Sequence, residues 1–279
     1  MQIVIEGQIL RLSEILLEDI MRNSKLIFSV TIAAGVSLGI GAASAADLPA
    51  RTYTKAPPMM VDPVYNWSGF YAGINGGGGS SRNCWNLTNN AGTAVVPPAP
   101  EGCHNATGGT AGGQIGYRWQ SAAWVFGVEA QGNWANFQGT NVNIAGGAGA
   151  VGDRSRIDAF GLFTGQVGYA INNVLLYVKG GAAVTSDKYN NYAVATNVDF
   201  SNGSDKVWGG VVGVGLEYGF ASNWSVALEY DHMFMGTQSE TLTLNAGGGL
   251  SGMHNISQDV DIGTVRLNYR FGGLVVAKY

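Results

Sequence analysis

Acidic residues that could serve as general acids or bases interrupt apolar segments of this 279-residue chain. Glu217, Glu229 and Asp231 lie within WGGVVGVGLEYGFASNWSVALEYDHMF, residues 208–234. Carboxylates in apolar surroundings are costly unless they are paired, so these three need partners. A catalytic role would need a nucleophile or a water beside an activating base. Asp231 and His232 are neighbours, so on a strand they point to opposite faces and do not pair.

The other histidines give no stronger indication of catalysis. His104 and His254 fall in segments expected to be loops, where the nearby Ser and Asp residues are no more than chance supplies. No spacing places a nucleophile beside a base, and a fold alone implies no activity. We therefore expect no enzyme, with no catalytic, metal-binding or cofactor-binding residues.

Composition excludes several other classes of protein. Charged residues make up only 12% of the chain, 43 residues are Gly, and the net charge is −4. A chain without a basic surface is not expected to bind nucleic acid. The abundant Trp, Tyr and Phe argue against disorder, and the low charge is not typical of a soluble helical enzyme.

A secretory signal peptide is expected near the N-terminus. Arg22 and Lys25 precede an apolar stretch at 26–41, and Ala43-Ser44-Ala45 is a cleavage site of the A-x-A type. The alternative, a transmembrane anchor, is disfavoured because the apolar run is short and ends in small residues. After Ala45 no apolar run is long enough for a spanning helix.

The chain is accordingly divided into four parts. Residues 1–20 are interpreted as a mis-called start that precedes the true initiator, Met21, and 21–45 as the signal peptide. Residues 46–64 are Pro-rich, lack periodicity and form an extended periplasmic segment. Residues 65–279 are expected to form the folded domain.

Alternation and turn residues divide that domain into eight strand candidates. Three connections are short and polar, whereas four are long and rich in Gly, Asn, Ser and Thr. An even number of strands with short turns at one end and long loops at the other is typical of an outer-membrane β-barrel. A soluble sandwich has no such regular alternation. The strands are expected at 68–77, 112–119, 123–134, 157–169, 174–185, 207–220, 224–234 and 261–271, and the long loops at 78–111, 135–155, 186–206 and 235–260.

Within each strand one face is apolar and the other is small, polar or charged. Aromatic residues flank the short turns (Trp119, Trp124, Tyr169, Phe220, Trp224), and others lie near the opposite strand ends (Trp134, Trp208, Phe234). Two aromatic girdles around an apolar band indicate a lipid-facing surface. The polar face then points into a lumen that side chains fill in an eight-stranded barrel. The expected lumen ion-pair network is Arg118, Glu129, Lys179, Glu217, Glu229, Asp231, Arg266 and Arg270, with Gln114, Gln131, Thr164, Gln166 and Asn268 joining by hydrogen bonds.

Strands four and five are less regular. Phe160 and Leu162 share a face with Thr164 and Gln166, and Leu175 shares one with Tyr177 and Lys179. Either these apolar residues plug the lumen or the expected register slips there.

Two cysteines, Cys84 and Cys103, lie in one Gly-, Asn- and Pro-rich stretch. In the oxidising compartment that a signal peptide implies, we expect them to pair as a disulfide within one loop. A metal site with the adjoining His104 is the weaker alternative, because two or three ligands at this spacing are poor evidence for metal.

Several stretches resemble a known family. AADLPARTYTKAPPMMVDPVYNWSGFYAGINGG, LFTGQVGYAINNVLLYVKGG, VGVGLEYGFASNWSVALEYDHMF and VRLNYRFGG are similar to small Gram-negative outer-membrane barrels of the porin family, the OmpA-like/RopB-type immunogenic surface proteins. The resemblance implies an outer-membrane location with extracellular loops and periplasmic turns. It also implies insertion by the barrel-assembly machinery, which would read the last strand, 263–271, with Tyr269 and Phe271 as the signal. The residues that follow leave open whether Phe271 or Tyr279 is the terminal aromatic.

The favoured function is a non-enzymatic role in envelope integrity and surface interaction. The expected partners are outer-membrane lipid and lipopolysaccharide, and host or phage surfaces met by the loops. A low-conductance pore for small solutes is the alternative, since eight strands leave no wide channel. A further alternative, which the resemblance suggests, is haem capture by loop residues such as His104, Tyr192, Met253 and His254.

Overall fold

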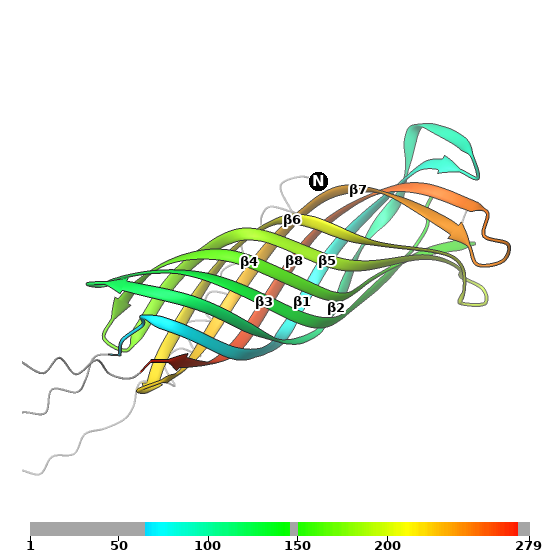
Figure 1. Ribbon diagram of the computed structural model, residues 1–279. Helices are drawn as coiled ribbons and strands as arrows, with labels where there is room; N and C mark the ends of the chain where they lie inside the picture. Colours follow the sequence, from blue (N-terminus) through cyan, green and yellow to red (C-terminus); the bar gives the residue numbers. More distant parts are fainter. Residues whose placement is uncertain (1–64, 146–149, 273–279) are drawn as a thin grey trace, which may run out of the picture. The chain divides into compact units, whose positions relative to one another are not determined.

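Eight antiparallel strands form a closed barrel in the computed structural model, which describes residues 65–145 and 150–272. Each strand pairs with its neighbour in sequence, and the first pairs with the last. Figure 1 shows the strands side by side and tilted, forming the wall of the barrel. The expected eight-stranded barrel is therefore confirmed. The strands are β1 (Gly69–Asn90), β2 (Thr93–Ser121), β3 (Trp124–Val142), β4 (Val151–Ile171), β5 (Val174–Ala193), β6 (Val198–Ala221), β7 (Trp224–Leu244) and β8 (Leu250–Phe271).

Alternation along each strand positions the lumen side chains. On β7 the buried residues Ala227, Glu229 and Asp231 alternate with exposed Leu228 and Tyr230. Successive residues of a strand point to opposite faces, and the closed ladder satisfies the backbone hydrogen bonds that lipid cannot. Charges therefore face inward and aliphatic side chains face lipid.

Both expected aromatic girdles lie on the outer surface. Trp124 and Trp134 mark the two ends of the apolar part of the outer face on β3, and Trp208 is exposed on β6. At about 3.4 Å per residue and a tilt of about 40°, ten residues rise about 26 Å along the barrel axis. That height matches the roughly 25 Å apolar band of an outer-membrane barrel.

The four long loops were predicted wrongly. The strands continue through most of these segments, so the outer connections shrink to 91–92, 143–150, 194–197 and 245–249. The polar residues there still alternate between faces, and their inward members pack together: Trp85, Tyr189, Leu242 and Ile256 form a small core. Polarity alone indicated loops, but a strand that has left the membrane needs no apolar outer face.

The short turns lie close to their expected positions, at 122–123, 172–173 and 222–223. Ala122 and Asn172 both adopt φ of +53°. Two-residue hairpins favour such left-handed backbone because its twist matches that of the flanking strands.

The irregular part of β4 reflects a bulge. Ile157 pairs with Asp187 and Ala159 with Ser186, so Asp158 is the extra residue. Below it, Phe160 and Leu162 are buried on the lumen face with Thr164 and Gln166. Of the two interpretations left open by the sequence, the apolar plug is therefore the one observed.

Three predicted parts of the chain, 1–20, 21–45 and 46–64, lie outside the described residues. Among the residues that are described, no helix is long and apolar enough to cross a membrane.

Candidate functional site

The lumen is the candidate functional site, and Arg266 lies at the centre of its charge network. Its guanidinium contacts Glu129 at 2.5 Å and also binds Glu229. Two phenols complete the arrangement, since Tyr71 donates to Glu129 and Tyr177 donates to Glu229, each at 2.6 Å. A buried charge is tolerated only when opposite charges and donors surround it, and each of these groups meets that condition.

Lys179 extends the network toward the extracellular end. Its ammonium lies 2.7 Å from Glu229 and 3.1 Å from Asp231. All three side chains are almost fully buried. One lysine therefore holds two carboxylates that would otherwise repel each other.

A second ion pair joins Arg118 to Glu217, 2.8 Å apart. Ser225 and Asn268 also donate hydrogen bonds to Glu217. The Arg118 guanidinium carbon lies 4.4 Å from the centre of the Tyr71 ring, within the range of a cation–π contact. Glu217 lies near the end of β6, so this pair is close to the end of the barrel that carries the short turns.

Arg270 requires a correction. It was predicted to join the ion-pair network, but it is buried beside the turns and donates to the backbone carbonyls of Ser68, Ser222 and Gly272. Arg270 lies one residue before the end of β8, close to the β6–β7 turn and to the residues that precede β1 and follow β8, and the carbonyls there accept its hydrogen bonds. It therefore ties the strand ends together instead of neutralising an acid.

Amides join the network as expected, with others that the sequence did not single out. Gln114 donates to Asn268 at 2.7 Å, and Gln166 accepts from Arg118 and donates to Tyr71. Gln131 donates to Asn133, which donates in turn to Asn75. Thr164 is buried on the same inner face.

Glycines leave room for the two buried phenols. A Cβ at Gly116 would lie 2.5 Å from the Tyr71 hydroxyl, and one at Gly215 would lie 2.2 Å from the Tyr177 ring. Both distances are far below van der Waals contact, so only a residue without a side chain fits at these two positions.

An aromatic pair that the sequence analysis missed closes the turn end of the lumen. Tyr65 and Trp67 precede β1, and both are buried against Val125, Leu175 and Tyr177. The backbone N–H of Tyr65 donates to the Asn173 side chain, and that of Trp67 to the Gln120 side chain. An aromatic doublet just before the first strand was the available signal.

An apolar layer crosses the lumen on the other side of the charge network. Phe137, Phe160 and Met233 are among its members, and each is at most 4% exposed. The layer separates the charge network from the extracellular half of the lumen. Its members are Ala106, Phe137, Ile157, Phe160, Leu162, Ala183, Val207, Val211, Met233, Met235, Val260 and Ile262.

The extracellular half holds a second polar cluster, which sequence reasoning missed. His254 Nδ1 lies 2.7 Å from Glu101, and both side chains are almost fully buried. Asn143 donates to Glu101 and to Asp153, and Asn191 also donates to Asp153. No sequence signal marked Glu101 or Asp153, because an acid within a polar segment is not unusual.

His104 and His254 were expected in solvated loops, and that prediction is wrong. Both lie on strands, His104 on β2 and His254 on β8, with their side chains buried. His104 Nδ1 contacts Asn141 at 2.6 Å, and burial lowers the pKa of His104. Met253 is exposed on the opposite face of β8 from His254, so these two candidate haem ligands do not converge.

Burial sets the ionisation of the acids in this half. It raises the pKa of Asp153 to about 7, and the nearby charge of Glu101 adds to the shift. Burial likewise raises the pKa of Asp187 to about 6 and that of Glu240 to about 7. These carboxyls therefore titrate close to neutral pH, because transfer from water disfavours the charged form.

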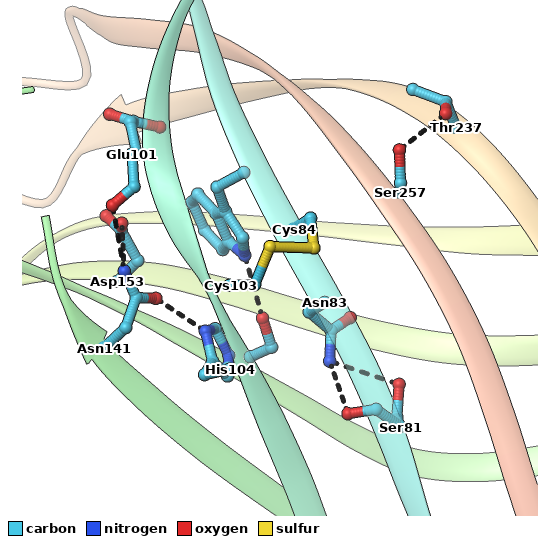
Figure 2. The surroundings of a disulfide bond; sticks show 12 residues. Ser81, Asn83, Cys84, Glu101, Cys103, His104, Asn141, Asp153, Thr237 and Ser257 are labelled. Atoms are coloured by element: carbon cyan, nitrogen blue, oxygen red, sulfur yellow. Dashed lines mark hydrogen bonds between the residues drawn. A yellow bond between two sulfur atoms is a disulfide. The ribbon is translucent and has the colours of Figure 1, made fainter. Parts of the chain in front are cut away.

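Cys84 and Cys103 form a disulfide between the parts of β1 and β2 that extend beyond the membrane on the extracellular side (Figure 2). They are directly opposite each other on β1 and β2, not within a loop as expected. Cys103 is exposed, whereas the Glu101, Asp153 and His104 side chains drawn in Figure 2 are buried, so the bond lies on the outer face of the barrel and these side chains on the inner face. Within the described ranges, no group of three or more His, Cys, Asp or Glu residues could hold a metal ion.

The two residues of the expected assembly signal lie on the outer face of the last strand. Tyr269 and Phe271 are both exposed, with ring centres 5.1 Å apart in an edge-to-face contact. Tyr279, the other candidate for the terminal aromatic, lies outside the described residues.

The chain is similar to known outer-membrane proteins. The 31 kDa outer-membrane immunogenic protein of Brucella melitensis biotype 1 is 28% identical over 261 residues, which cover 87% of this chain and 99% of that protein. The 22 kDa outer membrane protein of Rhizobium leguminosarum bv. viciae is 30% identical over 210 residues, covering 75% and 82%. OprG from Pseudomonas aeruginosa, a solved outer-membrane protein structure, has 13% identity and a TM-score of 0.46 over 74% of this chain and 97% of its own.

The family described as outer membrane protein beta-barrel domain matches residues 32–271, most of the chain. Together with the closed eight-stranded barrel and the outer-membrane relatives, this match identifies the chain as a member of the outer membrane protein beta-barrel family, located in the outer membrane.

Proposed function

We propose that this protein is a closed, non-conducting barrel that supports the envelope and presents an extracellular surface. The apolar layer across the lumen is the observation that carries the proposal. An ion that crosses it would lose its hydration without gaining a polar partner, and that loss is costly. The charge network below the layer is already internally paired, so it offers no vacant charge to a passing solute.

The packing of the turn end supports the same proposal. A cavity of about 10 Å³ remains among Tyr65, Trp67, Tyr71, Arg118 and neighbouring residues. That volume accommodates about one water molecule. A continuous aqueous path would need both this end and the apolar layer to rearrange.

Planar-bilayer recording tests the proposal directly. We expect the full-length protein to give no channel steps, and the double variant Phe137→Ala/Phe160→Ala to give small currents because it thins the layer. Phe163→Ala is the matched control, since Phe163 lies on the same strand as Phe160 but faces lipid. Large, stable currents from the unmodified protein would overturn the proposal, and small reproducible steps would favour the low-conductance pore.

The proposal includes the absence of catalysis. Two histidines contact carboxylates at 2.7 Å, the buried His254 with Glu101 and the partly exposed His232 with Asp261. General-base activation of a nucleophile requires a hydroxyl or thiol hydrogen-bonded to that base. In the described part of the chain, the hydrogen bonds join no such group to the imidazole of His254 or of His232. The Glu101–His254 pair therefore connects β2 to β8 as a structural element.

The expected partners follow from the same proposal. Lipid and lipopolysaccharide surround the apolar band. The parts of the strands that extend beyond the membrane on the extracellular side contact host or phage surfaces. The barrel-assembly machinery reads the last strand through Tyr269 and Phe271. Replacement of Phe271 by Ser should lower the amount of barrel recovered in outer-membrane fractions, whereas Phe70→Ser, an exposed aromatic at the same end of β1, should not.

A further inference from the structure

Three cations form a row on the outer face of the barrel, just outside the membrane. Arg156 of β4 is directly opposite Lys188 of β5. Lys206 of β6 pairs with Ser186, and Lys188 pairs with Ser204, so Lys188 and Lys206 are diagonal neighbours. All three side chains are exposed. We call Arg156, Lys188 and Lys206 the basic row.

The basic row lacks enough negative charge of its own. Like charges placed directly opposite each other destabilise a ladder. Arg156 and Lys188 both contact a single carboxylate, that of Asp158, which the β4 bulge turns outward. Lys206 forms no ion pair with any carboxylate that the structure describes, and the exposed side chain of its neighbour Asp205 accepts a hydrogen bond from the Lys206 backbone N–H. Among the three cations, the ion pairs of the described residues therefore involve one acid, Asp158.

The height of the row indicates what neutralises it. Lys206 lies two residues beyond the girdle residue Trp208 on the same face of β6. Val184 pairs with Trp208, so Lys188 lies four residues beyond the girdle on β5. At about 3.3 Å per residue and a tilt of about 40°, the row is about 5–10 Å above the girdle. That layer is occupied by lipid headgroups, which extend several Å beyond the hydrocarbon core.

We propose that the basic row binds the phosphate groups of the outer-leaflet glycolipid, lipid A. Arg and Lys clusters beside a membrane bind anionic headgroups, and guanidinium donors match phosphate oxygens. The row faces sideways at headgroup depth, so a macromolecule arriving from the medium would have to displace lipid to reach it. Phosphate oxygens supply the negative charge that Asp158 alone does not.

The test compares lipids that differ only in phosphate. The full-length protein, refolded in micelles, is titrated calorimetrically with diphosphoryl lipid A and with dephosphorylated lipid A in the same detergent. We expect at least ten-fold tighter binding of the phosphorylated lipid. The triple variant Arg156→Gln/Lys188→Gln/Lys206→Gln should lose that preference, and Lys188→Gln alone should reduce it several-fold.

Arg82→Gln is the matched control for Lys188→Gln, because Arg82 is an exposed cation on β1, four strands around the barrel. It should leave the preference unchanged, and Lys188→Arg should preserve it. The faster gel mobility of unheated protein verifies that each variant is folded. A triple variant that keeps the preference would overturn the proposal. So would equally tight binding of soluble pyrophosphate, which would indicate an anion site independent of lipid.

Discussion

Tyr71 and Gly116 occupy one space inside the barrel, the phenol of one filling the volume that a side chain on the other would need. A Cβ at position 116 would lie 2.5 Å from the oxygen of the Tyr71 hydroxyl group, and this hydroxyl donates a hydrogen bond to Glu129. Gly116→Ala should therefore displace Tyr71 and lower the free energy of unfolding by about 1–3 kcal/mol, the usual cost of overpacking.

Urea titration of the barrel in micelles measures this effect. Gly132→Ala is the control, because a Cβ at Gly132 meets nothing within 4 Å. Equal stabilities of the two variants would contradict the assigned packing of Tyr71.

Arg266 neutralises two carboxylates, so its loss should be severe. Arg266→Met leaves Glu229 with Lys179 alone and leaves Glu129 with Lys179 at 4.0 Å as its nearest cation. We expect a loss of about 3–5 kcal/mol in the free energy of unfolding, the range for breaking a buried ion pair. Urea unfolding and the yield of folded barrel report the change.

The half-exposed pair Arg154–Asp199, 2.7 Å apart, provides the comparison. Arg154→Met should cost less than about 1 kcal/mol, since water screens such pairs. A similar loss from both variants would show that Arg266 does not hold the lumen charges together.

The extracellular cluster should be more stable at acidic than at alkaline pH. The folded pKa of Asp153 is raised to about 7 by burial, above its value of about 4 in an unfolded chain. The folded state therefore binds the proton more tightly, so its stabilisation is full below pH 4 and is lost as the pH rises through 7. A shift of about three pKa units corresponds to a difference on the order of 4 kcal/mol.

Amide hydrogen exchange of the β3–β4 extension, recorded at pH 5 and pH 8 and corrected for intrinsic rates, measures this dependence. Asp153→Asn should flatten it and increase protection at pH 8. Asp259→Asn, which alters an exposed acid on β8, should leave it intact. A pH dependence that survives in Asp153→Asn would assign the titration to another group.

The disulfide should stabilise the β1–β2 extension locally. Cys84 and Cys103 are 19 positions apart in the sequence, and closing a loop of that size contributes about 3 kcal/mol in the chain-entropy description. The Cys84→Ser/Cys103→Ser variant should be cleaved by trypsin after Arg82 at least ten-fold faster on intact cells. The mobility of the unheated barrel should not change, because the membrane-embedded ladder is independent of the bond. Unchanged cleavage would show that pairing with β8 alone holds the extension.

The sequence determines which residues face the lumen far better than which of them pair. A charge such as Glu229 stands out in an apolar strand, and strict alternation assigns its face. Whether Arg266 meets Glu129 or Glu217 depends on the stagger between strands, which no local pattern encodes. The partners of Arg270 could not be predicted for the same reason. Its carbonyl partners lie on a turn, before β1 and directly after β8.

Beyond the membrane the same signals weaken. Glu101 and Asp153 lie among other polar residues, so nothing in their local sequence marks them as buried. The outward face there is polar too, and alternation in hydropathy, the basis for expecting a strand, largely disappears. Tyr71 was not singled out because an aromatic residue near a turn is normally interpreted as part of a girdle.

The composition of β2 affects how copies of this protein behave when crowded on a cell. β3 pairs with β2 only from Thr107 onward, and the Ile144 N–H donates to the Glu101 carbonyl, so the open side of β2 is the stretch before Glu101. Pro97, Pro98 and Pro100 lie in that stretch. Proline carries no amide proton, so this border is a poor template for a strand from a neighbouring molecule. Dense arrays of the protein can therefore form without their tips joining into continuous intermolecular sheets.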